Sequence, residues 1–239
     1  MIEINVLDKL RQIDTATICN VIELFDVRPF TVGYMDQSIK SCFHELPPIV
    51  GFASTATYRS AAPHNDIGPY DKLLEQIDRF EELSGPAVII FQDLDVPTVA
   101  ATFGDIMCNT YKAFGAVGLI TSGAGRDLDQ IREIEFPVFT NGTNCSHGYG
   151  QIPQICVQIK VGGMVINPND LIHGDHNGIT TIPLEIASEV ADVADDFVAA
   201  EARILETVKS DNPSKEKCLV ARDEFANSIE KIKKEISCK

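Results

Sequence analysis

The chain has 239 residues, 44% of them hydrophobic, which is enough to bury a substantial core. Its formal charge is −15, with 20 basic residues against 35 acidic ones, the opposite of the Lys and Arg excess that binds phosphate backbones. We therefore expect no nucleic-acid partner. No window reaches the roughly 18 apolar residues of a membrane span, so no membrane association is expected either.

The cellular compartment is indicated by the first residues and by the cysteines. Residues 1–14 contain acids and have helical periodicity, whereas a signal peptide begins with basic residues and an apolar run. The seven cysteines are widely spaced and form no Cys-x-x-Cys pair, which favours reduced thiols. These features predict a cytoplasmic protein.

The first third of the chain contains helices around one strand. Apolar residues at helical spacing predict a helix over residues 3–25 with a possible break at Asp14-Thr15. Residues 49–59 are small and β-branched, as in a buried strand. Residues 70–83 form an amphipathic helix that Ser84-Gly85-Pro86 ends.

From residue 87 onward, short strands and helices alternate. In chain order we expect a strand at 87–92, a strand or the lead into a turn at 97–103, a helix at 105–115, a strand at 116–122, a helix at 128–134 and a strand at 136–141. This alternation predicts an α/β protein in which strands pair in parallel.

The last third of the chain changes from strands to helices. Residues 154–183 have β-branched runs divided by polar turns, which predicts hairpins. Residues 183–210 and 215–236 have helical periodicity. We expect a domain at residues 1–183 and a C-terminal helical extension at residues 184–239, which packs on the domain or on a neighbouring subunit.

Two acids and an arginine lie at the two ends of residues 105–127. Asp105 begins an expected helix, where unpaired N–H groups favour carboxylates and anionic ligands. Arg126 and Asp127 follow the next expected strand. Because a crossover helix brings the carboxyl ends of parallel strands together, we expect the three side chains to meet at one mouth.

Such a group of side chains suits a small oxo acid and its enolate. An arginine can fork onto a carboxylate or an oxyanion, and two acids can hold a hard divalent cation together with several waters. A plainer alternative also fits the residues. In that alternative Asp127 caps the short helix that follows it, and Arg126 forms an ion pair with Asp105.

The segment GDIMCNTYKAFGAVGLITSGAGRDLDQIRE, followed by FPVF, resembles the signature of the regulator-of-ribonuclease-activity A family and of its enzyme branch, the 4-hydroxy-4-methyl-2-oxoglutarate aldolases. That signature is an Asp, twenty residues and then Arg-Asp, and residues 106–125 are the twenty. GPAVIIFQD and GGMVINPNDLIHGDHNGITTIP resemble further family segments in the same order, and the match covers roughly residues 13–183.

The chain departs from the aldolase pattern at three positions. Asn20 stands where many members carry Asp, and Gly125 stands where they have a larger residue before the arginine. Gln130 stands where the aldolases often have an acid. These departures put the substrate and catalytic competence in question, but not the fold.

The resemblance implies a fold and a cofactor. The fold is a β-β-α sandwich of the swivelling-domain type, assembled as a homotrimer or hexamer with sites between subunits. The cofactor is a divalent metal, magnesium or manganese, which Asp127 would bind and Asp105 would support through water.

The resemblance also implies how a small 2-oxo acid substrate is held. Arg126 would bind the pyruvate moiety and stabilise its enolate oxygen. The backbone amides that would receive the carboxylate belong to Gly104, Asp105, Ile106 and Met107.

A glutamate from the C-terminal helix of the neighbouring subunit completes the site in similar enzymes. We assign this role to Glu201, with Glu206 and Asp196 as alternatives.

The resemblance predicts a class II-type, divalent-metal-dependent aldolase that cleaves a 4-hydroxy-2-oxo acid to pyruvate, with oxaloacetate decarboxylation as a side activity. The alternative is a non-catalytic regulator that binds an RNA-processing enzyme such as ribonuclease E. The helical tail favours the enzyme, because the regulators resemble a shorter chain, and Gln130 favours the regulator. Elsewhere we expect Cys145 and His147 to be ordinary loop residues, and His173 to His176 to be a polar turn rather than a zinc site.

Overall fold

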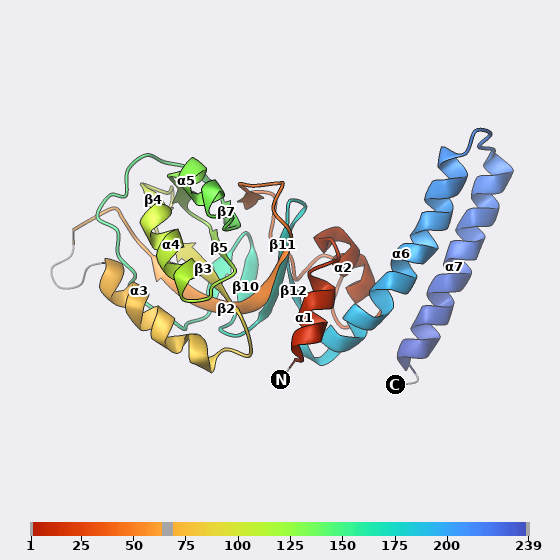
Figure 1. Ribbon diagram of the computed structural model, residues 1–239, viewed down its shortest axis with the longest axis horizontal. Helices are drawn as coiled ribbons and strands as arrows, with labels where there is room; N and C mark the ends of the chain where they lie inside the picture. Colours follow the sequence, from red (N-terminus) through yellow and green to blue (C-terminus); the bar gives the residue numbers. More distant parts are fainter. Residues whose placement is uncertain (1, 64–68, 238–239) are drawn as a thin grey trace.

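The computed structural model describes residues 2–63 and 69–237. Its centre is a seven-stranded mixed sheet (Figure 1). In spatial order the strands are β1 (Lys40–Ser41), β7 (Val138–Thr140), β5 (Gly118–Thr121), β3 (Ala87–Asp93), β2 (Ile49–Tyr58), β11 (Leu171–Asp175) and β12 (Gly178–Ile182). The strands β2, β3, β5 and β7 are parallel, whereas β1, β11 and β12 run antiparallel to their neighbours.

Both faces of the sheet are covered, and every residue of β2 is therefore buried. One face carries α3 (Pro69–Asp78), the short 3-10 helix η1 (Arg79–Glu82), α4 (Asp105–Ala113) and α5 (Leu128–Glu133) (Figure 1). The hairpin of β9 (Ile159–Val161) and β10 (Met164–Ile166) packs on the other face. The predicted α/β fold, a β-β-α sandwich, is confirmed.

A second, three-stranded sheet lies beside the first and shapes the candidate site. It consists of β4 (Ala101–Phe103), β6 (Ala124–Gly125) and β8 (Gly142–Thr143), all parallel. Residues 97–103, for which the sequence left a strand or the lead into a turn open, contain the strand β4, which pairs with β6 and not with β5. The strands β3 and β7 already occupy both edges of β5, so β4 has no place beside β5 in the main sheet.

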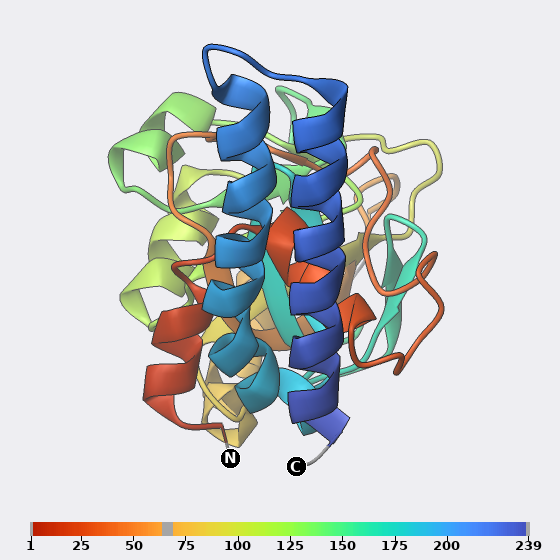
Figure 2. The same cartoon turned by 90° about the vertical axis from the view of Figure 1, so that its right-hand side faces the viewer.

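The N-terminal and C-terminal helices pack together at one end of the sheet. The break predicted at Asp14 separates α1 (Ile4–Leu10) from α2 (Thr15–Glu23), and the Asp14 carboxylate caps α2 by accepting the Thr17 N–H at 3.0 Å. After a 3-10 turn, η2 (Leu184–Ile186), the chain forms the helices α6 (Ala187–Lys209) and α7 (Lys215–Ser237), which lie side by side (Figures 1 and 2).

The C-terminal helical extension that the sequence predicted is present, and α6 packs on α1 and α2 through one apolar cluster. That cluster joins Leu10 and Ile18 to Val190 and Phe197. The division of the chain into domains at residue 183 stays a prediction. None of the helices in the described ranges is long and apolar enough to cross a membrane.

Candidate functional site

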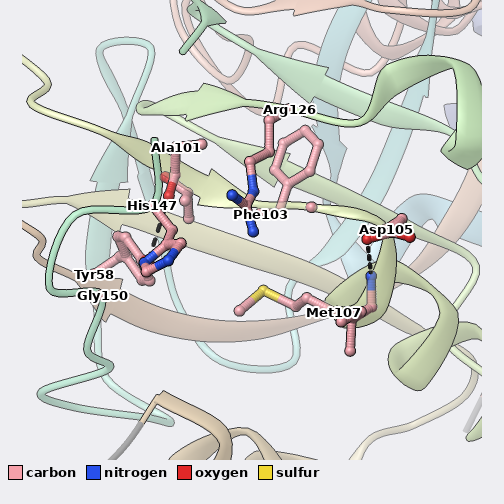
Figure 3. A pocket seen from close by; sticks show the side chains of 11 residues that line it. Tyr58, Ala101, Phe103, Asp105, Met107, Arg126, His147 and Gly150 are labelled. Carbon is pink, nitrogen blue, oxygen red and sulfur yellow. Dashed lines mark hydrogen bonds between the residues drawn. The ribbon is translucent and has the colours of Figure 1, made fainter. Parts of the chain in front are cut away.

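A cavity of about 190 Å³ opens where the second sheet meets the first turn of α4 (Figure 3). Its walls come from the ends of β2 and β4, the start of α4, Arg126, and the loop at residues 144–150. Asp105, Ile106, Met107 and Arg126 all line it, as does Gly104. Four of the five substrate-binding positions predicted from the sequence are thus contiguous in the wall, and Arg126 faces them.

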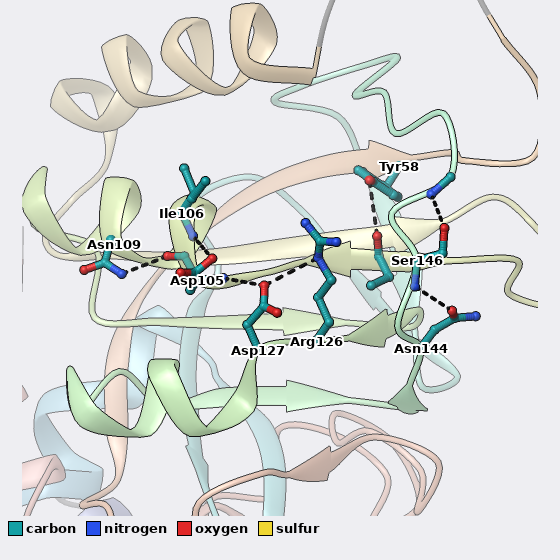
Figure 4. Close-up of polar contacts among 10 residues, drawn as sticks. Tyr58, Asp105, Ile106, Asn109, Arg126, Asp127, Asn144 and Ser146 are labelled. Atoms are coloured by element: carbon teal, nitrogen blue, oxygen red, sulfur yellow. Dashed lines mark hydrogen bonds and ion pairs between the residues drawn. The ribbon is translucent and has the colours of Figure 1, made fainter.

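Asp105, Arg126 and Asp127 meet as the sequence predicted, through the parallel pairing of β4 with β6. Phe103 stands opposite Gly125 in that pairing, and the Arg126 N–H donates to the Phe103 carbonyl at 3.1 Å. The Asp127 carboxylate therefore lies over the start of α4. Its Oδ2 accepts the Asp105 N–H at 3.3 Å and lies 3.5 Å from the Arg126 Nε (Figure 4).

The structure does not show the plainer alternative, in which Asp127 caps the short helix that follows it and Arg126 forms an ion pair with Asp105. Asp127 is the N-cap residue of α5, but its side chain makes no cap hydrogen bond to that helix. Its backbone is left-handed, with φ of 56°, a conformation that Asp tolerates better than most residues. The carboxylate is thereby directed to α4, and within the described ranges Arg126 pairs with Asp127 rather than with Asp105.

Two glycines allow the close approach of these groups. A Cβ at Gly104 would lie 2.5 Å from the Asp127 Oδ2 and 3.0 Å from the Arg126 Nε. A Cβ at Gly125 would lie 2.3 Å from the ring of Phe103. The Phe103 ring thus occupies the space that a side chain at position 125 would need.

Two of the amides expected to bind a substrate carboxylate already hold carboxylates of the protein. The Asp105 N–H donates to Asp127, and the Ile106 N–H donates to the Asp105 Oδ1 at 2.8 Å. An anion that binds at this helix start has to displace these acceptors. The position is therefore suited to negative charge, as the N-terminus of α4 favours.

The donor set decides which metal could bind. The described residues contain no group of three or more His, Cys, Asp or Glu side chains able to hold an ion. Asp127, with a side chain 34% exposed, offers one carboxylate, and Asp105 lies next to it. Such hard oxygen donors fit magnesium or manganese that keeps most of its waters, and they do not fit a structural zinc.

His147 and Tyr58 form a part of the cavity wall that the sequence did not reveal. His147 lies in a loop as expected, but it also lines the cavity, beside Tyr58 and Gly150 (Figure 3). The Tyr58 side chain is 2% exposed, and its hydroxyl donates to the Ala101 carbonyl at 3.3 Å. The only sequence signal was a polar loop just after the strand at residues 138–140.

Glu201 lies far from Arg126 within one protomer. It is part of α6, at the opposite end of the molecule from α4 and α5 (Figure 1). Burial, and next the charge of Asp14, raise the pKa of its carboxyl. Glu201 can therefore take its expected role only at the site of a second copy of the chain.

The polar segment at His173 is structural, as expected, although His173 itself lies in β11 and not in a turn. Its ring is fully buried, with Nδ1 2.9 Å from the Thr15 Oγ1 and Nε2 3.0 Å from the Leu10 carbonyl. Asp175 accepts the Thr15 N–H at 3.0 Å. Because both ring nitrogens already have partners, His173 joins the N-terminal helices to the sheet and does not bind zinc.

Comparison with known sequences assigns the family. A sequence model described as RraA-like (Aldolase/RraA) matches residues 15–181, most of the chain. The chain belongs to the RraA-like family. The matched region ends just before the two C-terminal helices and contains every candidate site residue except Glu201 and its alternatives, Glu206 and Asp196.

A relative of the RraA-like chain is a protein of Halalkalibacterium halodurans named "Putative 4-hydroxy-4-methyl-2-oxoglutarate aldolase". The two are 35% identical over 101 residues, which are 42% of this chain and 48% of that protein. The RraA-like chain spans about half, or less, of the lengths of the first curated relatives it matches.

Two solved structures have the same fold as the RraA-like chain. An uncharacterized protein from Pseudomonas syringae pv. tomato superposes with a TM-score of 0.71 at 24% identity, covering 92% of this chain and 95% of that one. RraAS2 of Streptomyces coelicolor, described as an unusual member of the RNase ES inhibitor RraA protein family, gives 0.66 at 20% identity, covering 84% and 96%.

Proposed function

We propose that this RraA-like chain is a divalent-metal-dependent aldolase that cleaves a 4-hydroxy-2-oxo acid, of the 4-hydroxy-4-methyl-2-oxoglutarate type, to pyruvate. The observation that carries the proposal is the convergence of Arg126, Asp127 and the α4 N-terminus at one cavity. The name of the H. halodurans relative agrees with this class of reaction.

The oxo-acid end of the substrate binds between Arg126 and α4. Its carboxylate takes the place of the protein carboxylates at the amides of Asp105 and Ile106, with Gly104 and Met107 alongside. Arg126 donates to the C2 oxygen, where its fixed positive charge is favourable. The Asp127 carboxylate, 3.5 Å from the Arg126 Nε, keeps the guanidinium in place.

Asp127 holds the magnesium or manganese ion in this proposal, and Asp105 supports it through a water. When bound, the ion supplies Lewis-acid polarisation of the substrate's oxo-acid group. Within the protein, Arg126 stabilises the negative charge that develops on the C2 oxygen as the C3–C4 bond breaks. Decarboxylation of oxaloacetate passes through the same pyruvate enolate, so it is an expected side activity.

The complete site requires an oligomer, a homotrimer or hexamer. Glu201 lies on α6 at the far end of the protomer, and burial already favours its protonated form. In the proposal this carboxyl reaches the cavity of the neighbouring subunit.

The test measures pyruvate release from oxaloacetate and from 4-hydroxy-4-methyl-2-oxoglutarate, with magnesium and with EDTA. We expect both reactions in magnesium and neither in EDTA. Asp127→Ala should abolish them, whereas Asp129→Ala, at a side chain 90% exposed, should leave them unchanged. Full activity of Asp127→Ala would contradict the proposal.

The regulator alternative is favoured by one residue. Gln130 is exposed on α5, at the position where similar aldolases often have an acid. If the wild-type chain cleaves no oxo acid in magnesium, the regulator becomes the better assignment, and capture of an RNA-processing enzyme such as ribonuclease E would then support it.

A further inference from the structure

His147 lies in the cavity wall on the side away from Asp105. Figure 3 shows its ring beside Tyr58, with Arg126 between this pair and Asp105. In a substrate whose C2 oxygen is held at Arg126, the C4 atom lies two bonds from C2 along the carbon skeleton. The cavity is small, about 190 Å³, so C4 and its hydroxyl come close to the opposite wall.

The loop that carries His147 is fixed to the two strands that border the cavity. The Ala101 N–H of β4 donates to the Ser146 carbonyl at 2.7 Å. The Tyr149 N–H donates to the carbonyl of Ser60, just after β2, at 3.0 Å. Further hydrogen bonds within the loop, shown in Figure 4, join Asn144 to Ser146 at 3.1 Å. These bonds hold His147 at the mouth of the cavity.

Among the described residues that line the cavity, Tyr58, Asp105, Arg126 and His147 have titratable side chains. Arginine keeps its proton under all ordinary conditions. The Asp105 Oδ1 accepts the Ile106 N–H, and the buried Tyr58 hydroxyl donates to a carbonyl. The ring of His147 makes no hydrogen bond within the described ranges, and an imidazole both accepts and releases protons near neutral pH.

We propose that His147 is the general base of this site. It accepts the proton of the substrate's C4 hydroxyl. The inference rests on the proposed aldolase function, and it adds the group that moves the proton.

The step balances with water as the only further participant. An imidazole nitrogen takes the C4 hydroxyl proton, and the O–H electron pair becomes the second bond of the new C4 carbonyl. The C3–C4 pair becomes the C2–C3 double bond, and the C2 carbonyl pair moves to the oxygen beside Arg126. C3 of the enolate takes a proton from a water molecule, the C2 carbonyl re-forms, and pyruvate leaves. The imidazolium returns its proton to the hydroxide left by that water.

Comparing two reactions tests this role. Aldol cleavage requires removal of a hydroxyl proton, whereas oxaloacetate has no C4 hydroxyl and loses carbon dioxide without a base. We expect His147→Gln to lower kcat for aldol cleavage by about 100-fold or more. Its decarboxylation of oxaloacetate should stay within about threefold of the wild type. Cys145→Ser, in the same loop and outside the cavity wall, is the matched control.

The pH profile gives a second readout. We expect the wild type to show a rise of kcat/KM for aldol cleavage with pH, as general-base catalysis requires, and His147→Gln to lose this rise. Tyr58, Asp105 and Arg126, the other titratable groups of the described wall, are unchanged in the variant. The lost rise therefore reports on His147.

Two results would overturn the assignment of His147. One is aldol cleavage by His147→Gln at the wild-type rate. The other is an equal loss of both reactions, which indicates a role in binding or folding. A wild-type chain without either reaction would overturn the aldolase proposal together with this inference, and the wild-type control reveals that case by itself.

Discussion

The Oδ2 of Asp127 accepts a hydrogen bond from the backbone N–H of Asp105 at 3.3 Å, across 22 residues of sequence. This contact joins the start of α5 to the start of α4. It places a carboxylate at a helix N-terminus, where an anionic ligand also prefers to bind. Under the proposed function, a protein carboxylate and a substrate carboxylate would therefore compete for the same amides.

Gly104→Ala should damage this arrangement without unfolding the protein. The added Cβ would lie 2.5 Å from the Asp127 Oδ2, so the carboxylate must move away from α4. We expect pyruvate release to fall by about tenfold or more, because misplacement of a catalytic group by about 1 Å has large effects. Gly142→Ala is the control, since its Cβ meets nothing within 4 Å. Equal activity of the two variants would show that the contact is dispensable.

Asp93→Asn should stabilise the fold at neutral pH. Asp93 is 6% exposed, and its Oδ2 has no hydrogen-bond partner among the described residues. Burial, assisted by the charge of Asp95, raises the pKa of the Asp93 carboxyl. The protonated Asp93 therefore stabilises the fold fully at pH values below its unfolded-state pKa, about 3.9. This stabilisation is lost as the pH rises.

Asparagine removes this dependence and keeps the acceptor for the Asp95 N–H, which is 2.9 Å from Oδ1. Urea unfolding at pH 7 should give a free energy about 1 kcal/mol higher than that of the wild type, with a smaller gain at pH 4. Asp129→Asn, at an exposed position, should have no such effect. A loss of stability in Asp93→Asn at pH 7 would show that the charged form is favoured by contacts other than those described.

The secondary structure around the site was predictable, because it is encoded in local patterns. The apolar spacing in residues 105–115 and the Gly115 that follows predicted α4, and Gly115 does have a positive φ of 90°. The spacing from Asp105 to Arg126, the length of one strand-helix-strand unit, predicted that they meet at one mouth, and both residues line the cavity. Both predictions needed only contacts that are close in sequence or imposed by parallel strands.

The partner of β4 and the position of His147 could not be predicted, since both depend on distant contacts. Three residues, Ala101–Phe103, are too few to have a readable period. They cannot pair with β5 because β3 and β7 fill both of its edges, which is a property of the whole sheet. His147 reaches the cavity because β4 holds its loop through the Ser146 carbonyl, and no local pattern encodes that bond.

Phe197→Ala should show that α6 is part of the core. Phe197 is 5% exposed and packs edge to face on Phe225 of α7, with 6.0 Å between ring centroids. Truncation of such a side chain typically costs about 3–5 kcal/mol of unfolding free energy. Val198→Ala, at the next residue, which is 45% exposed, should cost no more than about 0.5 kcal/mol. Similar urea unfolding midpoints for the two variants would mean that the C-terminal helices α6 and α7 unfold independently of the rest of the protein.

His173 should make the stability of the fold depend on pH. Burial lowers the pKa of its ring, and the hydrogen bond to the Leu10 carbonyl and the charges of Asp175 and Asp14 oppose this only in part. The native state therefore holds a neutral ring, whereas the unfolded chain takes up a proton below about pH 6.5. Stability from this group is present above that pH and is lost as pH falls toward the lower native pKa.

The measurement is urea unfolding between pH 5 and 8 of the wild type and His173→Gln. Glutamine keeps one donor and one acceptor and does not titrate, so the variant should be less stable at pH 8 by about 1–3 kcal/mol. The difference should shrink as pH falls, by at most about 1.4 kcal/mol per pH unit, which corresponds to one proton. The raised pKa of Glu201 makes stability fall as the pH rises, the opposite of the effect of His173. Both proteins contain this carboxyl, so its effect cancels in the difference between them. A difference that is constant from pH 5 to 8 would mean that the native state accepts a charged His173 beside Asp175.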